Sequence, residues 1–132
     1  MIDFKNGALF KLKRDKNAKV GQVEDLLIEG ETVIGSYTAV RDYVVFTNKR
    51  IIAVNVQGIT GKKQDYSSLP YSKVQAFSVE TAGVIDLDSE LELYFSALGK
   101  VKFEFTGDSN VKAITFGEEL KMGPRESLVI EL

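Results

Sequence analysis

Hydrophobic and polar residues alternate along much of this chain with the two-residue period of a β-strand. The alternation is clearest over 90–95 and 102–105, where leucine and phenylalanine occupy one set of positions and mostly charged residues the other. This pattern is typical of strands with one face in the core and the other in water. Runs of β-branched and aromatic residues predict further strands. These runs lie at about 33–39, 43–46 and 51–56. Residues 62–69 and 74–80, on either side of a turn at Pro70-Tyr71, are most simply two further strands.

Two short breaks between these strands predict β-hairpins. The polar break at 47–50 can hold a two-residue loop of Asn48 and Lys49, and that loop would pair Phe46 with Ile51. Asn tolerates the positive φ that such a loop requires. The second break, at 97–99, should contain an odd number of loop residues, because the leucine and phenylalanine faces of its two strands must match.

Two segments have helical rather than strand spacing. Apolar residues recur every three or four positions between Val20 and Glu29, before Gly30, which predicts a short N-terminal helix. Ala113, Phe116 and Leu120 predict a second helix that ends at Gly123-Pro124. Three residues can cap the start of this second helix. They are Asp108, Ser109 and Asn110.

These elements predict a single, mainly β domain. About seven short strands followed by one amphipathic helix favour a bent antiparallel sheet or sandwich, with the helix packed over one open end. The tail at 127–132 is apolar for a chain end, so we expect it to pair with a sheet edge, either of its own chain or of a neighbouring copy.

The amino-acid composition excludes several kinds of catalytic and metal site but identifies no activity. The 132 residues include no cysteine and no histidine, which excludes disulfides, thiolate nucleophiles, histidine-based catalytic triads and the commonest transition-metal ligand. The net charge of −2 gives no general reason to expect nucleic acid. Charge is divided unevenly, because residues 1–66 hold 11 basic and 8 acidic residues and residues 67–132 hold 6 and 11. No apolar run reaches membrane-spanning length and no signal peptide is evident, so we expect a cytoplasmic protein.

An acidic stripe lies at the start of the 90–95 strand. Asp86, Asp88, Glu90 and Glu92 recur at every second residue. Carboxylates suit Ca²⁺ or Mg²⁺, but neighbours on one strand face lie about 7 Å apart, too far to share one ion easily. We therefore favour a solvated face paired with Lys100 and Lys102 over a metal site. Nothing marks one of these carboxylates as a buried catalytic acid, so no enzyme activity and no cofactor are expected.

A basic segment precedes the predicted helix. Its five cations could contact an anionic membrane surface, although such runs are usually solvated. They are Lys11, Lys13, Arg14, Lys16 and Lys19.

The turn at 58–63 lacks the spacing of a phosphate-binding loop, because it has only two residues between its glycines and no Ser or Thr after the lysine. Tyr66, Tyr71 and Phe77 could stack on bases, but core or interface packing fits the acidic net charge better.

Several ordered motifs together resemble the bacterial pleckstrin-homology (PH-like) family. The resemblance covers about 26–121, and the motifs are 45–52, 57–63, 68–71, 77–83 and 86–91. Its motif positions, mainly structural, are Thr47, Asn48, Arg50, Gly58, Gly61, Lys62, Pro70, Tyr71 and Gly83. The chain is thereby divided into a PH-like core, a basic arm at 1–19 and an apolar tail at 124–132.

The resemblance implies both a fold and a role. It implies a strongly bent seven-stranded β-sandwich with one C-terminal helix, and a scaffold that assembles into ring-shaped homo-oligomers, often five-fold, without established catalytic activity. Eukaryotic PH domains bind phosphoinositides through a basic loop between their first two strands. The corresponding connection here, 39–42, is short and carries one arginine beside an aspartate, so phosphoinositide binding is not expected. We expect a self-associating interaction domain, and the alternative is membrane-surface binding through the basic segment.

Overall fold

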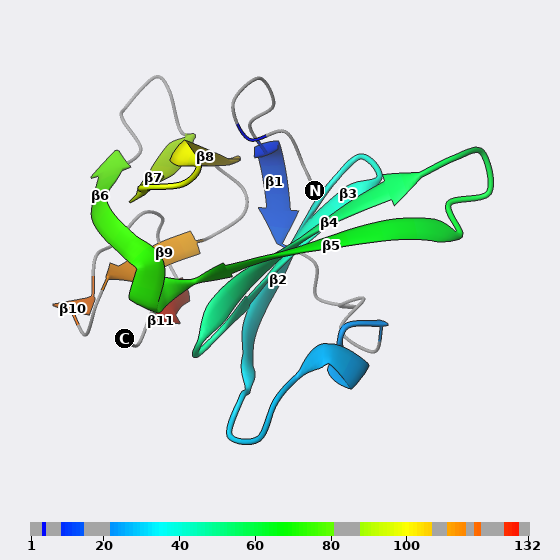
Figure 1. Ribbon diagram of the computed structural model, residues 1–132. Coiled ribbons are helices and arrows are strands. Elements are labelled where there is room, and N and C mark those ends of the chain that lie inside the picture. Colours follow the sequence, from blue (N-terminus) through cyan, green and yellow to red (C-terminus); the bar gives the residue numbers. More distant parts are fainter. Residues whose placement is uncertain are drawn as a thin grey trace.

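Figure 1 shows the computed structural model of the protein. The structure describes residue 4 and residues 9–14, 22–80, 88–106, 111–115, 118–119 and 126–129.

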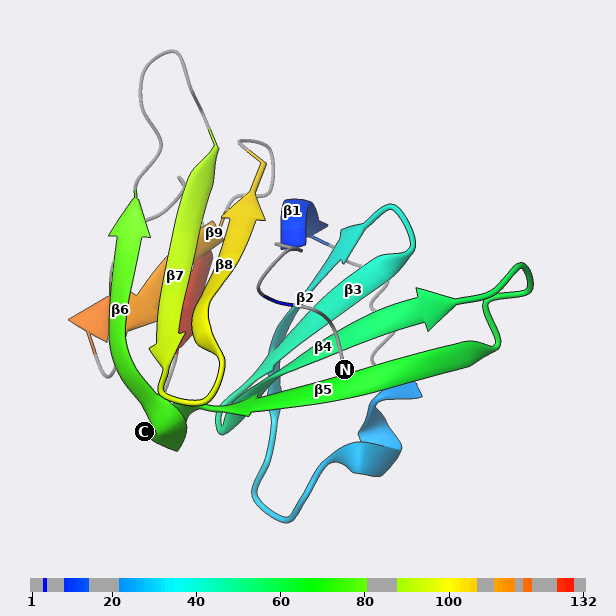
Figure 2. The same ribbon diagram turned by 45° about the horizontal axis from the view of Figure 1, so that its top comes forward.

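The described part of the chain is mainly β and is built around one curled, open sheet of eight strands, a half-barrel (Figures 1 and 2). The strands are β1 (Leu9–Arg14), β2 (Val33–Ala39), β3 (Asp42–Thr47), β4 (Arg50–Gln57), β5 (Lys63–Pro70), β6 (Val74–Glu80), β7 (Ser89–Phe95) and β8 (Gly99–Phe105). Their order across the sheet is β5-β4-β3-β2-β1-β8-β7-β6. A 3₁₀ turn, η3 (Tyr71–Lys73), joins the two edge strands β5 and β6. The sheet therefore curls without closing into a barrel.

β1 joins the two halves of this sheet. It pairs antiparallel with β2 and parallel with β8, and its Leu12 is fully buried. The expected seven strands thus become an eight-stranded sheet, with residues 9–14 as an internal strand. Residues 10–13 do alternate apolar and charged side chains, as strands do, but the cations favoured the interpretation of this stretch as a basic arm. Pairing on both sides stabilises the strand.

The concave side of the half-barrel holds the main core. Inward-facing residues from both halves meet there, and Tyr37 packs its ring edge-on against Phe46 and Phe105, with centroids 5.6 and 5.2 Å apart. β3 and β4 are also buried on their outer face, where Val23 covers a smaller cluster that includes Val45 and Ile52. Burial on both faces explains why these two strands read as nearly continuous apolar runs rather than as alternating ones.

The two hairpins have the expected registers. Phe46 pairs with Ile51 across β3 and β4, as the polar break predicts. Phe95 pairs with Gly99 across β7 and β8, which leaves three loop residues, an odd number as expected. The reason proposed for Asn48 is wrong, because Val40 is the only non-glycine residue with positive φ in the described segments.

The predicted C-terminal helix is wrong. Residues 111–115 form strand β9 (Val111–Thr115), followed by β10 (Glu118–Glu119) and β11 (Glu126–Val129), in a three-stranded sheet of order β10-β9-β11. The expected tail pairing does occur, because β11 runs parallel to β9. The apolar residues of 111–115 fit either helical or strand spacing, but β-branched residues favour a strand. The hydrogen-bonded pairing with β11 decides for the strand. The proposed caps and Phe116 and Leu120 lie outside the described residues.

The predicted N-terminal helix is also wrong over its described part. Residues 22–29 contain no α-helix: Gln22 and η2 (Glu24–Leu26) have 3₁₀ conformation, after which Leu27 adopts an extended conformation. No side chain caps this turn, and Val23 is buried against the outer face of the sheet. Tertiary anchoring therefore decides the conformation of a segment that is too short to be a stable helix. No helix among the described residues is long and apolar enough to cross a membrane.

Candidate functional site

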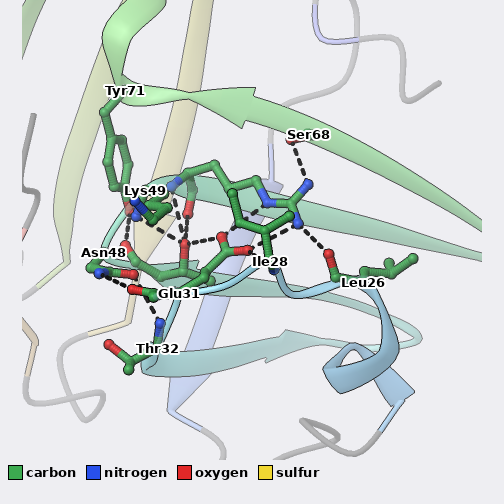
Figure 3. Close-up of polar contacts among 11 residues, drawn as sticks. Leu26, Ile28, Glu31, Thr32, Asn48, Lys49, Ser68 and Tyr71 are labelled. Atoms are coloured by element: carbon green, nitrogen blue, oxygen red, sulfur yellow. Dashed lines mark hydrogen bonds and ion pairs between the residues drawn. The ribbon is translucent and has the colours of Figure 1, made fainter.

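Among the residues that the structure describes, the most extensive polar site lies where the 22–32 segment meets the β3–β4 turn (Figure 3). Its centre is the buried cluster of Glu31, Thr47 and Arg50. Glu31 comes from the connection before β2, Thr47 ends β3 and Arg50 begins β4. The side chain of Glu31 is 0% exposed and that of Arg50 is 21% exposed. A charged pair at this depth needs good geometry to offset the loss of hydration.

The geometry of the buried cluster meets that requirement. Arg50 donates in bidentate fashion, from Nε to Oε2 of Glu31 over 3.0 Å and from Nη2 to Oε1 over 3.1 Å. Thr47 Oγ1 donates to Oε2 of Glu31 over 2.7 Å, and the backbone N–H of Ile28 donates to Oε1 over 3.1 Å. Burial alone would raise the pKa of Glu31, but the hydrogen bonds from Arg50, Thr47 and Ile28 outweigh it and lower the pKa below the usual range. Glu31 is therefore held as a carboxylate.

Arg50 and Asn48 extend the cluster into the backbone of the 22–32 segment. Arg50 Nη2 also donates to the carbonyl of Leu26 over 2.6 Å. Asn48 donates from Nδ2 to the carbonyl of Gly30 over 2.9 Å and accepts the N–H of Thr32 at Oδ1 over 2.9 Å. The role of Asn48 is therefore to bind the neighbouring segment, not to supply a left-handed turn.

Tyr71 holds the same turn from the other side. Its buried hydroxyl donates to the carbonyl of Thr47 over 2.7 Å, and its N–H donates to the carbonyl of Lys49 over 3.2 Å. Burial, with a further contribution from the charge of Glu31, raises the pKa of the Tyr71 hydroxyl above its usual range. The hydroxyl is therefore a permanent donor at physiological pH.

The chemistry of this site is that of a structural clamp. Both oxygens of Glu31 accept two hydrogen bonds each. Thr47 Oγ1 also accepts the N–H groups of Lys49 and Arg50, over 3.1 and 3.0 Å, so its lone pairs are engaged as well. A carboxylate and a hydroxyl occupied in this way have no capacity left to act as general base or nucleophile.

Four of the family-motif positions meet at this clamp and three lie elsewhere. Thr47, Asn48, Arg50 and Tyr71 come together around the β3–β4 turn, with Pro70 next to Tyr71 at the end of β5. Gly58, Gly61 and Lys62 lie in the β4–β5 turn. Gly83 lies outside the described residues. Sequence reasoning missed Glu31, because no spacing signal connects it to Arg50.

Gly61 supports the β4–β5 turn for a specific reason. Its backbone φ is +67°, a value that residues other than glycine rarely adopt. A Cβ at this position would lie 3.2 Å from Cγ1 of Val56. Arg41, in the neighbouring β2–β3 turn, donates from Nη2 to the carbonyl of Gly58. The two turns are thereby fastened to each other.

The basic segment is only partly described. Lys11, Lys13 and Arg14 lie in β1, and Lys13 is exposed. Lys16 and Lys19 lie outside the described residues. The structure therefore places three of these five positions in an internal strand of the sheet.

The acidic stripe has ion-pair partners, as expected. Nζ of Lys102 lies 3.1 Å from Oε1 of Glu90, and Nζ of Lys100 lies 3.8 Å from Oε1 of Glu92. The lysines are on β8 and the glutamates on the adjacent strand β7. Asp86 lies outside the described residues. Among all the residues that the structure describes, no group of three or more Asp or Glu side chains could hold a metal ion.

The three aromatic residues considered for base stacking do not form one surface. Tyr71 is buried, Phe77 is half-buried against the main core, and Tyr66 is exposed on the edge strand β5.

Comparison with known proteins gives a consistent picture. The sequence matches the family model of the bacterial PH domain over residues 3–116. Two Bacillus subtilis (strain 168) proteins are similar to it, and both are described only as uncharacterized. YjqA is 47% identical over 92 residues, 68% of this chain and 74% of YjqA. YozO is 32% identical over 106 residues, 80% of this chain and 90% of YozO.

Solved structures also resemble this fold. A Shewanella loihica PV-4 protein with a pleckstrin-homology domain is 36% identical, with a TM-score of 0.60 over 72% of this chain and 83% of that one. A pleckstrin homology domain from Shewanella amazonensis SB2B is also 36% identical, with a TM-score of 0.51 over 76% of this chain and 79% of that one.

Proposed function

This chain belongs to the bacterial PH domain family, and on that premise we propose that it is a non-enzymatic interaction domain that self-associates into a ring-shaped homo-oligomer. The family domain is generally non-enzymatic, and the relatives described above have no assigned activity. We place the assembly in the cytoplasm.

The observation that carries the proposal is the open half-barrel. β5 and β6 are its two edge strands, and neither pairs with a second strand in the described part of the chain. Open edges favour association with another chain. When a head-to-tail contact between identical chains has a suitable rotation, it closes into a ring.

The saturated hydrogen bonding of the buried cluster supports a role without catalysis. Glu31 and Thr47 are buried, and their side-chain oxygens are occupied by donors from the 22–32 segment and the β3–β4 turn. Such a network stabilises a surface for interaction and offers nothing to a substrate.

Light scattering coupled to size-exclusion chromatography tests the proposal. At tens of micromolar, we expect a single species whose mass is a small multiple of the chain mass of 14.6 kDa. A monomer at every concentration up to that range would contradict self-association.

Membrane-surface binding through the basic segment is the competing function. The incorporation of residues 9–14 into the sheet makes it the weaker candidate. It requires salt-sensitive sedimentation with anionic vesicles that is lost when Lys16 and Lys19 become Gln. Absence of sedimentation at low salt would remove it.

A further inference from the structure

Two exposed surfaces of the β2–β5 half of the sheet carry opposite charge, and each also exposes aliphatic side chains. The basic tip comprises Val40, Arg41, Ile59, Lys62 and Lys63, in the turns β2–β3 and β4–β5 and the start of β5. The acidic ridge comprises Glu24, Asp25, Leu26, Ile28 and Glu29, in the segment that follows Val23. All ten residues are exposed.

The basic tip exposes its aliphatic residues to an unusual degree. Val40 and Ile59 have relative exposures of 106% and 105%, the highest among the large hydrophobic residues described. Val40 also has a φ of +46°, which is unfavourable for a β-branched residue. A residue with a fully exposed side chain and a strained backbone contributes little to the stability of its own chain. Such outliers are typical of functional surfaces.

The acidic ridge is exposed but firmly held. Leu26 and Ile28 are 41% and 60% exposed, yet their backbones are bonded to Arg50 and Glu31 of the buried cluster. Val23, just before the ridge, is completely buried against the outer face of the sheet. The ridge is thereby preorganised, which reduces the entropic cost of binding a partner.

The aliphatic residues of the two surfaces cannot meet within one chain. Leu26 is bonded to Arg50 at the start of β4, whereas Arg41 is bonded to Gly58 just beyond its end. The eight residues of β4 separate these two anchor points by about 25 Å. Within the described residues, no ion pair engages Lys62, Lys63 or the carboxylates of the ridge. Lys49, in the β3–β4 turn, is exposed and lies beside Gly30, the residue directly after the ridge.

We propose that the basic tip of one copy docks on the acidic ridge of the next copy. This inference rests on the proposed self-association and assigns its head-to-tail contact to these two surfaces, in addition to any pairing at the open edges β5 and β6. Val40 and Ile59 would pack against Leu26 and Ile28, with the cations of the tip beside the carboxylates of the ridge. Aliphatic contact supplies affinity and the charges select orientation.

The placement of the two surfaces makes the contact head-to-tail, which closes into a ring when its rotation divides a full turn and otherwise extends into a filament. The tip lies at the ends of the strands, whereas the ridge lies on the outer face of the sheet, below it in Figure 1. A contact between different surfaces of identical chains is heterologous, and it rotates each copy relative to the previous one.

Complementary charge reversal tests this interface in the full-length protein. The tip variant is Lys62→Glu with Lys63→Glu, and the ridge variant is Glu24→Lys with Asp25→Lys and Glu29→Lys. Each variant alone should associate about tenfold more weakly or worse, because its two surfaces then carry like charge. A variant that carries both sets of reversals in one chain should recover assembly, since each tip again meets a ridge of opposite charge whatever the number of copies in the ring. Assembly of the unmodified protein should also weaken with added salt.

A matched control places the same kind of reversal elsewhere. Lys73→Glu with Lys100→Glu changes two exposed lysines outside the proposed interface, and it should leave assembly unchanged. Circular dichroism and thermal unfolding of every variant separate lost association from lost folding.

The outcomes distinguish the interface from self-association itself. An unmodified protein that stays monomeric contradicts self-association and, with it, this interface. An unmodified oligomer that both reversals leave intact contradicts the interface alone, as does loss of assembly that the combined variant fails to recover. Salt-sensitive binding of the monomer to anionic vesicles, lost in the tip variant, would assign the tip to a membrane instead.

A separate variant tests the aliphatic part of the contact. Val40→Asn removes the aliphatic side chain but keeps a residue that tolerates positive φ. We expect an unchanged or higher unfolding midpoint together with association at least several-fold weaker. Unchanged association would show that Val40 lies outside the interface and would overturn the proposed packing.

Discussion

The β2–β5 half of the sheet buries hydrogen-bonded polar groups at one end and exposes apolar side chains at the other. At the β3–β4 turn, a buried carboxylate, a guanidinium and a hydroxyl are joined by hydrogen bonds, and the turn is held from both sides. At the other end, the turns β2–β3 and β4–β5 expose two aliphatic side chains completely. Arg41 and Gly58 form the one hydrogen bond described between those two turns.

This difference shows where each end contributes free energy. The buried cluster satisfies its groups within the chain, so its contribution is to folding stability. The basic tip leaves apolar surface in water and a valine in an unfavourable conformation, so its sequence contributes little to folding. Substitutions at the two ends should therefore have effects that differ in size and in sign.

The largest effect is expected from Arg50→Met. The variant leaves Glu31 buried without its cation, which should lower the free energy of unfolding by about 3–5 kcal/mol. Urea denaturation monitored by circular dichroism measures this loss. In the double variant Glu31→Gln with Arg50→Met, part of the stability should return because no buried charge remains. A loss under about 1 kcal/mol in the single variant would indicate that the pair behaves as a surface salt bridge.

Acidification should weaken the same end. The pKa of Glu31 in the folded protein lies below its ordinary value of 4.5. Its contribution to stability is therefore complete above pH 4.5 and is lost as the pH falls through the lower folded value. Unfolding midpoints measured from neutral pH downwards should fall more steeply for the unmodified protein than for the double variant. Parallel curves would contradict the role given to Glu31.

A smaller loss is expected from Gly61→Ala at the opposite end. Alanine disfavours the φ of +67°, and its Cβ would lie 3.2 Å from Val56, so we expect a loss of about 1–2 kcal/mol in the free energy of unfolding. Gly58→Ala is the matched control, because it has a φ of +75° and nothing within 4 Å of an added Cβ. Equal losses for the two variants would show that the contact with Val56 is unimportant.

The smallest effect, with the opposite sign, is expected from Val40→Asn. Relief of the unfavourable backbone conformation should raise the free energy of unfolding by up to about 1 kcal/mol. Ile59→Asn, at an equally exposed position without positive φ, should change it by less than about 0.5 kcal/mol. Both are measured by denaturation under conditions in which the protein is monomeric. A loss of stability in Val40→Asn would refute the comparison between the two ends.

Local patterning was sufficient to predict much of the sheet. The β3–β4 register followed from matching Phe46 with Ile51, because a slip of one residue would turn the apolar residues of a strand to the other face. The loop between β7 and β8 followed from the same argument. At β1 residues 10–13 alternate in the same way, but local patterning could not show that the segment pairs with β2 and β8, because β8 lies far away in the sequence.

The candidate site shows the same limit. Thr47, Asn48 and Arg50 stood out as family-motif positions, but the sequence contained nothing to connect them with Glu31. That connection depends on a fold that brings the 22–32 segment onto the β3–β4 turn. The C-terminal prediction failed in a related way, because the apolar residues of 111–115 fit either period and the partner strand β11 decided between them.

The sequence by itself determined the mainly β character of this protein, the positions of its hairpins and the exclusion of cysteine and histidine chemistry. These properties depend on residue type and on spacings of a few residues. Tertiary structure alone decided the eighth strand, the strand at 111–115, the buried partner of Arg50 and the exposure of Val40 and Ile59. Each of these depends on which distant segments come together, and that is set by the burial and hydrogen bonding of the whole chain rather than by any local pattern.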